Sequence, residues 1–212
     1  MRLGIMGGTF DPIHYGHLFV AEEARAIFGL EKVLFVPNGN PPHKKDYAIT
    51  SARHRFAMTQ IATAENPFFQ CSSIEQERDG PSYTYETLAL LRKEYSGHEL
   101  YYITGVDAVS DILSWKRHEE VIGNAKFIAA TRPGFDPEAL KQRLPEAYMN
   151  RIYLLRTTAI GTSSTDIRER VRTNLPVRYL TSDGVLDYIR RQNLYGAGKM
   201  LPGNECAEGD RE

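Results

Sequence analysis

Cysteine is nearly absent from this 212-residue chain, which contains only Cys71 and Cys206. Two cysteines so far apart supply neither a disulfide framework nor a cysteine zinc site. Long hydrophobic runs are also missing. None approaches the roughly 18 residues of a membrane span, and the N-terminal Met1-Arg2-Leu3-Gly4-Ile5 lacks the apolar stretch of a signal peptide. We therefore expect a soluble, cytoplasmic protein in a reducing environment.

Neither sign of charge is in clear excess. The chain has 26 Lys and Arg against 27 Asp and Glu, a formal charge of −1 and an isoelectric point near 6.6. This balance excludes the broad basic surface of a nucleic-acid-binding protein, although a local basic pocket remains compatible with it. The hydrophobic content of 42% and charged content of 25% are typical of a globular protein. Partners among nucleic acids or membranes are therefore not expected.

Short apolar runs alternate with segments of helical periodicity along the chain. The predicted strands are residues 3–6, 32–36, 68–74, 100–104, 127–130 and 152–155. Helices are predicted in each of the four connections before the strand 127–130, and two more at 164–171 and 183–191 follow the last strand. This alternation predicts an α/β fold, a doubly wound and mostly parallel sheet with helices on both faces. Ligands of such sheets bind beyond the carboxyl ends of the strands, where the strand order reverses.

The chain shows no internal repeat and no interdomain linker. We expect one domain over residues 1–195. Residues 196–212 are rich in glycine and charge and lack apolar periodicity, so we expect them to form a flexible tail. Such a tail should be dispensable for both activity and stability.

The strongest chemical signal is the loop between the first strand and the first helix, residues 7–17 (GGTFDPIHYGH). Gly7 and Gly8 let the backbone approach a ligand closely. The helix that begins near Tyr15 offers free N–H groups, and His14 and His17 can reach the same anion. Taken singly, the glycines are a tight turn and each histidine a satisfied polar residue. Together they predict a phosphate-binding loop, although the spacing matches neither a P-loop nor G-x-G-x-x-G.

A second cluster of hydroxyl groups opens a helix near the C-terminus, at residues 162–168 (TSSTDIR). Ser163 and Asp166 have the spacing of a capping box, which explains the serines without any ligand. It does not explain Arg168, one turn inside the helix. A capped helix keeps other free amides, so the cluster also fits a second anion-binding site.

Four further features fall in loops at the predicted ligand edge. They are Pro41-Pro42-His43-Lys44, the segment 83–88 (YTYETL), Gly105-Val106-Asp107 and Trp115. Each has a structural explanation of its own: a basic turn, a helix cap, a turn and a buried aromatic residue. Because all four lie at the same predicted edge of the sheet, a role in ligand binding is favoured over four separate structural explanations.

The order of these motifs resembles the bacterial nicotinate-nucleotide adenylyltransferases. They belong to a nucleotidyltransferase superfamily whose His-x-x-His signature is His14-Tyr15-Gly16-His17 here. The resemblance covers residues 4–195; the first and last motifs are superfamily-wide and the middle ones are specific to this branch. One departure is Thr162, where the family commonly has isoleucine. The resemblance implies a Rossmann-like nucleotidyltransferase fold. It also implies transfer of AMP from ATP to nicotinate mononucleotide in NAD biosynthesis, with release of pyrophosphate.

The resemblance also assigns roles to residues. It implies that His14, His17 and Arg168 are catalytic, and that Mg²⁺ is bound through the ATP phosphates without protein ligands. The implied ATP-binding residues are Gly7, Gly8, Thr9, Phe10, His14, His17, Gly105, Asp107, Ser163, Ser164, Thr165 and Arg168. The implied acceptor-binding residues are Asn38, His43, Lys44, Tyr83, Thr84 and Trp115. Among these, Thr84 and Trp115 would hold the nicotinate ring.

Two alternative functions stay open from the sequence. One is another adenylyltransferase of the superfamily, with phosphopantetheine or nicotinamide mononucleotide as the acceptor. The other is a nucleotide sensor that has the fold without turnover. The sequence also leaves open whether the chain forms a homo-oligomer and how strictly it prefers the acid mononucleotide over the amide.

Overall fold

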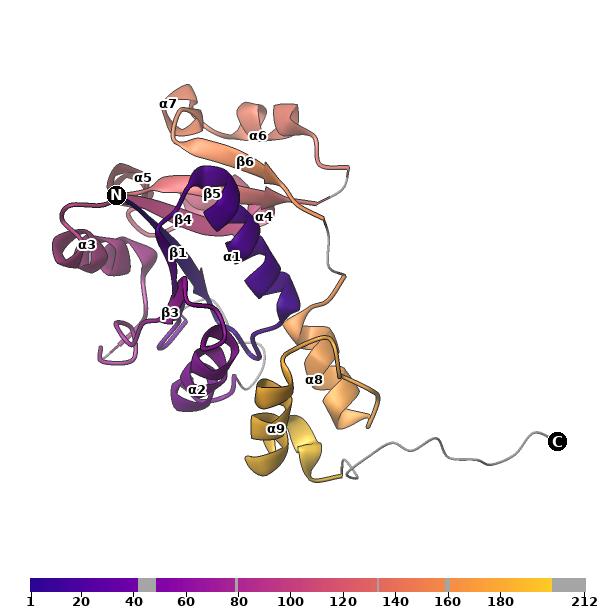
Figure 1. The fold of residues 1–212 in the computed structure, drawn as a ribbon. Coiled ribbons are helices and arrows are strands. Elements are labelled where there is room, and N and C mark those ends of the chain that lie inside the picture. The colour runs from indigo at the N-terminus through magenta and orange to yellow at the C-terminus, as the bar shows by residue number, and fades with distance from the viewer. Residues whose placement is uncertain (42–48, 79, 133, 159–160, 200–212) are drawn as a thin grey trace.

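The computed structural model describes residues 1–41, 49–78, 80–132, 134–158 and 161–199. Its centre is a sheet of six strands in the order β3-β2-β1-β4-β5-β6, and every neighbouring pair is parallel (Figure 1). The strands are β1 (Arg2–Gly8), β2 (Lys32–Pro37), β3 (Phe69–Cys71), β4 (Glu99–Gly105), β5 (Lys126–Thr131) and β6 (Ile152–Arg156). The predicted fold class is confirmed.

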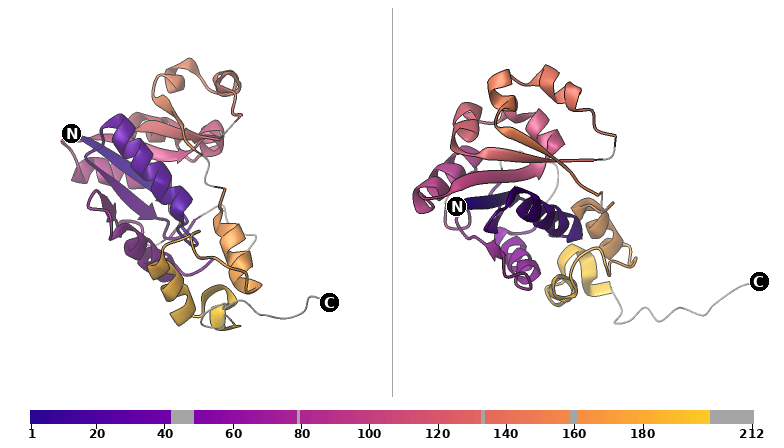
Figure 2. Two further views of the ribbon diagram at one scale, coloured as in Figure 1. Left: turned by 45° about the vertical axis from the view of Figure 1, so that its right-hand side comes forward. Right: turned by 45° about the horizontal axis from the view of Figure 1, so that its top comes forward.

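Helices cover both faces of the sheet (Figures 1 and 2). One face packs against α1 (Tyr15–Phe28) and α2 (Ala52–Thr63), and α8 (Ser164–Arg172) and α9 (Asp183–Arg191) contribute side chains to the same core. The other packs against α3 (Thr84–Glu94), α4 (Val106–Ser110), α5 (His118–Asn124) and α6 (Pro137–Arg143). The remaining elements are α7 (Glu146–Met149) and the 3₁₀ turns η1 (Ile112–Ser114) and η2 (Leu194–Lys199). No helix among the described residues is both long and apolar enough to cross a membrane.

Alternate residues of the central strands enter the two cores. Leu3 and Ile5 of β1 pack on the α3 side, whereas Met6 packs on the α1 side. Covering both faces explains why these strands are continuous apolar runs rather than alternating ones. The strand order reverses between β1 and β4, so the loops that follow these two strands flank the expected ligand position.

Three local features differ from the sequence-based expectation. The predicted third strand, 68–74, is only Phe69–Cys71 long, because the chain leaves the sheet into a turn at Ile74. The short helices α6 and α7 were not predicted. Ala197, expected in the flexible tail, is 3% exposed and belongs to the α1-side core. Residues 200–212 of that tail lie outside the described residues.

The burial of Ala197 changes what we expect of truncations. Ending the chain after Tyr195 should lower the free energy of unfolding by about 1 kcal/mol and Tm by about 2–4 °C, because a core methyl group is lost. Ending it after residue 199 should leave Tm unchanged. Calorimetry on the two truncated chains measures this difference, and identical Tm values would show that η2 adds no stability.

Candidate active site

Two cavities open at the carboxyl ends of β1 and β4. The first, of about 330 Å³, is called the α3 cavity here. Its lining residues are Gly7, Gly8, Thr9, Asn38, Pro41, Ser82, Tyr83, Thr84, Tyr102, Thr104, Ala108, Trp115 and Lys116. The second, of about 670 Å³, is the α8 cavity, and it is lined from α1, α8 and the ends of β4, β5 and β6. Thr104 lines both, so the two cavities meet at the reversal of strand order.

The β1–α1 loop is held through three consecutive carbonyl groups. Arg168 donates from Nη1 to the carbonyl oxygen of Asp11 at 2.7 Å. Ser164 Oγ donates to the carbonyl of Pro12 at 2.8 Å, and Thr181 Oγ1 to that of Ile13 at 2.8 Å. Each donor comes from the C-terminal segment that contains α8 and the approach to α9. The loop and this segment therefore form one structural unit.

His14 and His17 form a stacked pair where α1 begins. Their ring centroids are 3.7 Å apart at an interplanar angle of 24°, and both residues line the α8 cavity. The backbone N–H of His14 donates to Nδ1 of His17 at 3.3 Å. Since Nδ1 accepts, the proton of the neutral His17 ring lies on Nε2, which makes Nε2 a hydrogen-bond donor. Phe10 is buried with its ring edge-on to His17, at 5.0 Å between centroids.

The burial of His14 decides its charge. Desolvation lowers the pKa of His14 from 6.5 to about 4, so the ring is neutral near pH 7. A neutral imidazole next to His17 avoids the repulsion of two stacked cations. His14 therefore offers hydrogen bonds rather than positive charge to a ligand.

The start of α8 faces the same cavity. Ser163 caps the helix by accepting from the backbone N–H of Asp166 at 3.0 Å, as the capping pattern predicts. Ser163 and Ser164 both line the α8 cavity, together with Gly105. Arg168 also donates to Thr165 Oγ1 at 3.2 Å, so its guanidinium joins the helix to the β1–α1 loop. Backbone N–H groups at such a helix start favour an anion.

The α3 cavity has an aromatic wall. Trp115 packs edge-on against Tyr102 and Phe127, with centroids 6.2 and 6.5 Å away. Lys116 Nζ lies 4.0 Å from the centroid of the Tyr83 ring, at the same wall. Gly7 leaves room for the Tyr102 hydroxyl, which would overlap any Cβ at that position. The wall therefore combines a planar apolar surface with one positive charge.

The structure sorts the predicted site residues into groups. The α8 cavity contains His14, His17, Gly105, Ser163 and Ser164. The α3 cavity contains Gly7, Gly8, Thr9, Asn38, Tyr83, Thr84 and Trp115. Gly7, Gly8 and Thr9, which were predicted with the ATP-binding set, line the α3 cavity, and their role stays a prediction. Phe10, Asp107, Thr165 and Arg168 line neither cavity. Asp107 forms an exposed ion pair with Arg132 at 3.5 Å, and Arg132 lines the α8 cavity. His43 and Lys44 lie outside the described residues.

Arg55 is a supporting residue that the sequence did not reveal. It is 1% exposed, although it lies in the helix α2. Its guanidinium donates to three carbonyl oxygens, those of Thr9 at 2.9 Å, Gly39 at 2.9 Å and Thr50 at 2.8 Å. It therefore fixes the loops that follow β1 and β2 relative to each other. An arginine in a predicted helix is expected to be exposed to solvent, so the local sequence offers no reason to predict that Arg55 is buried.

Asp11 and Tyr195 form a second unpredicted contact. The buried Asp11 carboxylate accepts from the Tyr195 hydroxyl at 2.6 Å and from the backbone N–H of Thr50 at 3.2 Å. Burial, together with the negative charge of Asp11, raises the pKa of Tyr195 far above its usual range. The hydroxyl therefore stays protonated and keeps donating. The last described turn, η2, is tied in this way to the β1–α1 loop.

Comparisons with known proteins agree with this arrangement. Residues 5–170 match the family model described as cytidylyltransferase-like. A protein of Moorella thermoacetica named "Probable nicotinate-nucleotide adenylyltransferase" is 52% identical over 198 residues, covering 92% of this chain and 91% of its own. One of the same name from Thermoanaerobacter sp. is 48% identical, covering 92% of this chain and 94% of its own.

A solved structure shares the fold at lower identity. It is the Plasmodium falciparum nicotinic acid mononucleotide adenylyltransferase complexed with NaAD. It aligns with a TM-score of 0.74 and 22% identity, over 92% of this chain and 97% of its own. This likeness concerns the architecture of the chain, the six-stranded sheet with its two layers of helices.

The buried, neutral His14 makes stability depend on pH. Between pH 6.5 and 4 the unfolded chain binds a proton at this position that the folded chain does not. The free energy of unfolding should therefore decrease by about 3 kcal/mol as the pH falls through this window. Urea unfolding of the wild type and of a His14→Gln variant, from pH 7.5 to 4, measures the contribution of His14 to the pH dependence of the free energy of unfolding. Parallel curves for the two proteins would contradict it.

Proposed function

We propose that this chain, which belongs to the nicotinate-nucleotide adenylyltransferases of the cytidylyltransferase-like family, transfers AMP from ATP to nicotinate mononucleotide. The products are nicotinate adenine dinucleotide and pyrophosphate. The observation that supports this most directly is the His14–His17 pair facing the start of α8 in one cavity. A second cavity, with an aromatic wall, meets the first at Thr104. Two ligands placed there would face each other across the ends of β1 and β4.

The chemistry of this transfer suits such a site. An oxygen of the mononucleotide phosphate attacks the α-phosphorus of ATP. The bond to the bridging oxygen between the α- and β-phosphates breaks, and pyrophosphate leaves with that electron pair. The nucleophile is already an anion near pH 7, so no strong general base is needed. The protein's task is to bring two polyanions together and to stabilise the charge that moves onto pyrophosphate.

The residues of the α8 cavity would perform that task. The donor Nε2–H of His17 is suited to the α-phosphate, and the neutral His14 to a neighbouring phosphate oxygen. Ser163, Ser164 and the free amides of α8 would bind the remaining phosphates. Arg168 adds positive charge one turn into that helix, where Asp11 and Thr165 hold it. These roles follow electrostatic preorganisation rather than proton transfer.

The donor set also bears on Mg²⁺. Among the described residues, no group of three or more His, Cys, Asp or Glu side chains could hold a metal ion. Mg²⁺ commonly keeps its waters and binds through substrate phosphates, which fits a site built from neutral and cationic donors. We propose that Mg²⁺ enters with ATP. It would supply positive charge between the phosphate oxygens.

The α3 cavity would take the nicotinate mononucleotide. Trp115 offers a surface on which the pyridine ring can stack. The nicotinate carboxylate would accept hydrogen bonds at the start of α3, from Thr84 and the free amides there. Asn38 lies on the opposite wall, near the loop after β2. We keep His43 and Lys44 as proposed phosphate contacts on the strength of the family resemblance.

The first prediction of this function concerns His17. His17→Ala should lower kcat by about 10²–10³, equivalent to roughly 3–4 kcal/mol, because one preorganised donor to the transferred phosphate is lost. Pyrophosphate release measures kcat, and circular dichroism checks the fold. His118→Ala is the control, since His118 lies on α5, outside the α8 cavity, and is hydrogen-bonded to the Tyr148 hydroxyl. A folded His17→Ala variant with kcat within tenfold of the wild type would refute the assigned role.

The second prediction concerns the acceptor. We expect kcat/KM for nicotinate mononucleotide to exceed that for the amide by about ten- to hundredfold, because the amide leaves buried donors unpaired. Trp115→Ala should lower kcat/KM for both mononucleotides by the same factor, because the ring stacks alike in both. Thr84→Ala should bring the two values of kcat/KM closer together.

Pyrophosphate release should be measured with nicotinate mononucleotide, nicotinamide mononucleotide and phosphopantetheine as acceptors, which decides between the open alternatives. Equal kcat/KM for the acid and the amide mononucleotide would contradict the assignment of nicotinate mononucleotide as the substrate. Turnover with phosphopantetheine alone would point to the other branch of the superfamily. ATP binding without turnover on any acceptor would identify a sensor.

A further inference from the structure

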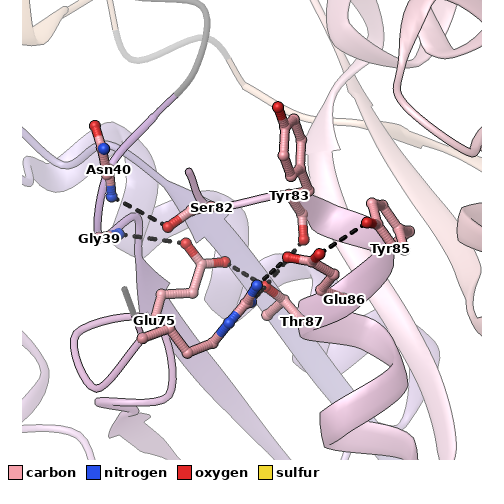
Figure 3. Close-up of polar contacts among 9 residues, drawn as sticks. Gly39, Asn40, Glu75, Ser82, Tyr83, Tyr85, Glu86 and Thr87 are labelled. Atoms are coloured by element: carbon pink, nitrogen blue, oxygen red, sulfur yellow. Dashed lines mark hydrogen bonds and ion pairs between the residues drawn. The ribbon is translucent and has the colours of Figure 1, made fainter. Parts of the chain in front are cut away.

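A buried carboxylate lies behind the α3 cavity. Glu75, in the turn after β3, is 6% exposed, and both of its oxygens accept hydrogen bonds (Figure 3). Oε2 accepts from the backbone N–H of Gly39 at 3.3 Å, and Oε1 accepts from Thr87 Oγ1 at 2.7 Å. Gly39 belongs to the loop after β2 and Thr87 to the first turns of α3. Glu75 therefore joins two segments that are adjacent only in the folded chain.

Those two segments form opposite walls of the cavity. Asn38 and Pro41 line it from the loop after β2, and Tyr83 and Thr84 line it from the start of α3. Gly39, Glu75 and Thr87 do not belong to the described lining. Glu75 thus contacts the neighbours of the lining residues without facing the cavity. Its influence on a ligand would be indirect.

A second link runs beside the first. Asn40 N–H donates to Ser82 Oγ at 3.1 Å (Figure 3). Ser82 N–H donates in turn to the carbonyl of Asn40 at 2.8 Å. Gly39 fits against the backbone of Glu75 so closely that a Cβ would overlap the Glu75 carbonyl oxygen. The distance between the two walls is therefore set by several short contacts, in which the Glu75 carboxylate is the central acceptor.

Glu75 also acts on a residue of the cavity itself. Burial, with a smaller share from the negative charge of Glu75, raises the pKa of Tyr102 well above its usual range. Tyr102 lines the α3 cavity and packs against Trp115. Its hydroxyl therefore remains neutral in the floor of the cavity.

We propose that Glu75 and Thr87 are positioning residues that set the width of the acceptor cavity and thereby the affinity for the mononucleotide. This inference rests on the proposed function, since it assumes that the α3 cavity takes nicotinate mononucleotide. Without the Thr87 hydroxyl, the buried Oε1 of Glu75 loses its hydrogen bond, which is the shorter of the two that the carboxylate accepts. The carboxylate then moves, and the loop after β2 moves with it. The α8 cavity shares only Thr104 of β4 with the lining of the α3 cavity and no residue of these two walls, so ATP binding should be unaffected.

The only tryptophan of the chain provides a direct readout. Trp115 lines the α3 cavity, so quenching of its fluorescence by nicotinate mononucleotide gives Kd without turnover. Thr87→Val should raise this Kd by at least about fivefold and leave KM for ATP within about twofold. Thr87→Ser restores the hydroxyl and should return Kd to within about twofold of the wild type. Thr63→Val is the matched control: it removes a buried hydroxyl that donates to the carbonyl of Thr59, in α2.

A second variant and distinct outcomes complete the test. Glu75→Ala removes both hydrogen bonds and should weaken mononucleotide binding at least as much as Thr87→Val. If it fails to fold, Thr87→Val carries the test alone. Quenching by the wild type with an unchanged Kd in folded Thr87→Val would overturn this inference and leave the proposed function standing. An equal loss of ATP and mononucleotide affinity would also overturn it, because the effect would then be general. If neither mononucleotide supports pyrophosphate release by the wild type, and nicotinate mononucleotide does not quench its fluorescence, both this inference and the proposed function are wrong.

Discussion

The site depends on one constraint, the capture of three successive carbonyl groups of the β1–α1 loop by Arg168, Ser164 and Thr181. The six residues between β1 and α1 have no ladder of backbone hydrogen bonds that would select one conformation. Hydrogen bonds from three side chains of the C-terminal segment select one. The stacked histidines, the entry into α1 and the facing start of α8 all follow from that choice. Two of the three side chains that hold the loop, Ser164 and Arg168, belong to α8, whose start would also bind phosphate.

A second layer of buried polar residues extends this arrangement to the other cavity. Arg55 fixes the loop after β1 against the loop after β2, and Glu75 fixes the latter against α3. Buried charges are costly unless their hydrogen-bonding capacity is used. Here it is used mostly on backbone groups of loops, which have no ladder of their own to satisfy them, and once on the hydroxyl of Thr87. The site is therefore built on rigid connections between loops rather than on the sheet alone.

Much of the fold could be predicted from local pattern. The apolar runs gave the strands, and the helix 183–191 agrees with α9 at both ends. The proximity of His14 and His17 and the helix cap at Ser163 could be predicted, because residue type and spacing suffice there. The catalytic role of the two histidines stays a prediction. Arg55, Glu75 and the contact of Asp11 with Tyr195 could not be predicted. Their side chains are typical of solvent-exposed positions, and only long-range contacts show that they are buried. The division of Gly7–Thr9 from the histidines needed three dimensions too, since the loop crosses from one cavity to the other.

The long reach of the loop's hydrogen bonds has a consequence during synthesis on the ribosome. The β1–α1 loop with His14 leaves the exit tunnel early, whereas its three anchoring donors lie more than 150 residues later in the chain. At about 5–20 residues per second, roughly 8–30 s separate the two events. During that interval the first strands and helices can pack, but the carbonyl groups of Asp11, Pro12 and Ile13 lack these three donors. A nascent chain therefore carries the nucleotide motif in an unformed state, and competence for binding arises late, as a property of the almost completed polypeptide.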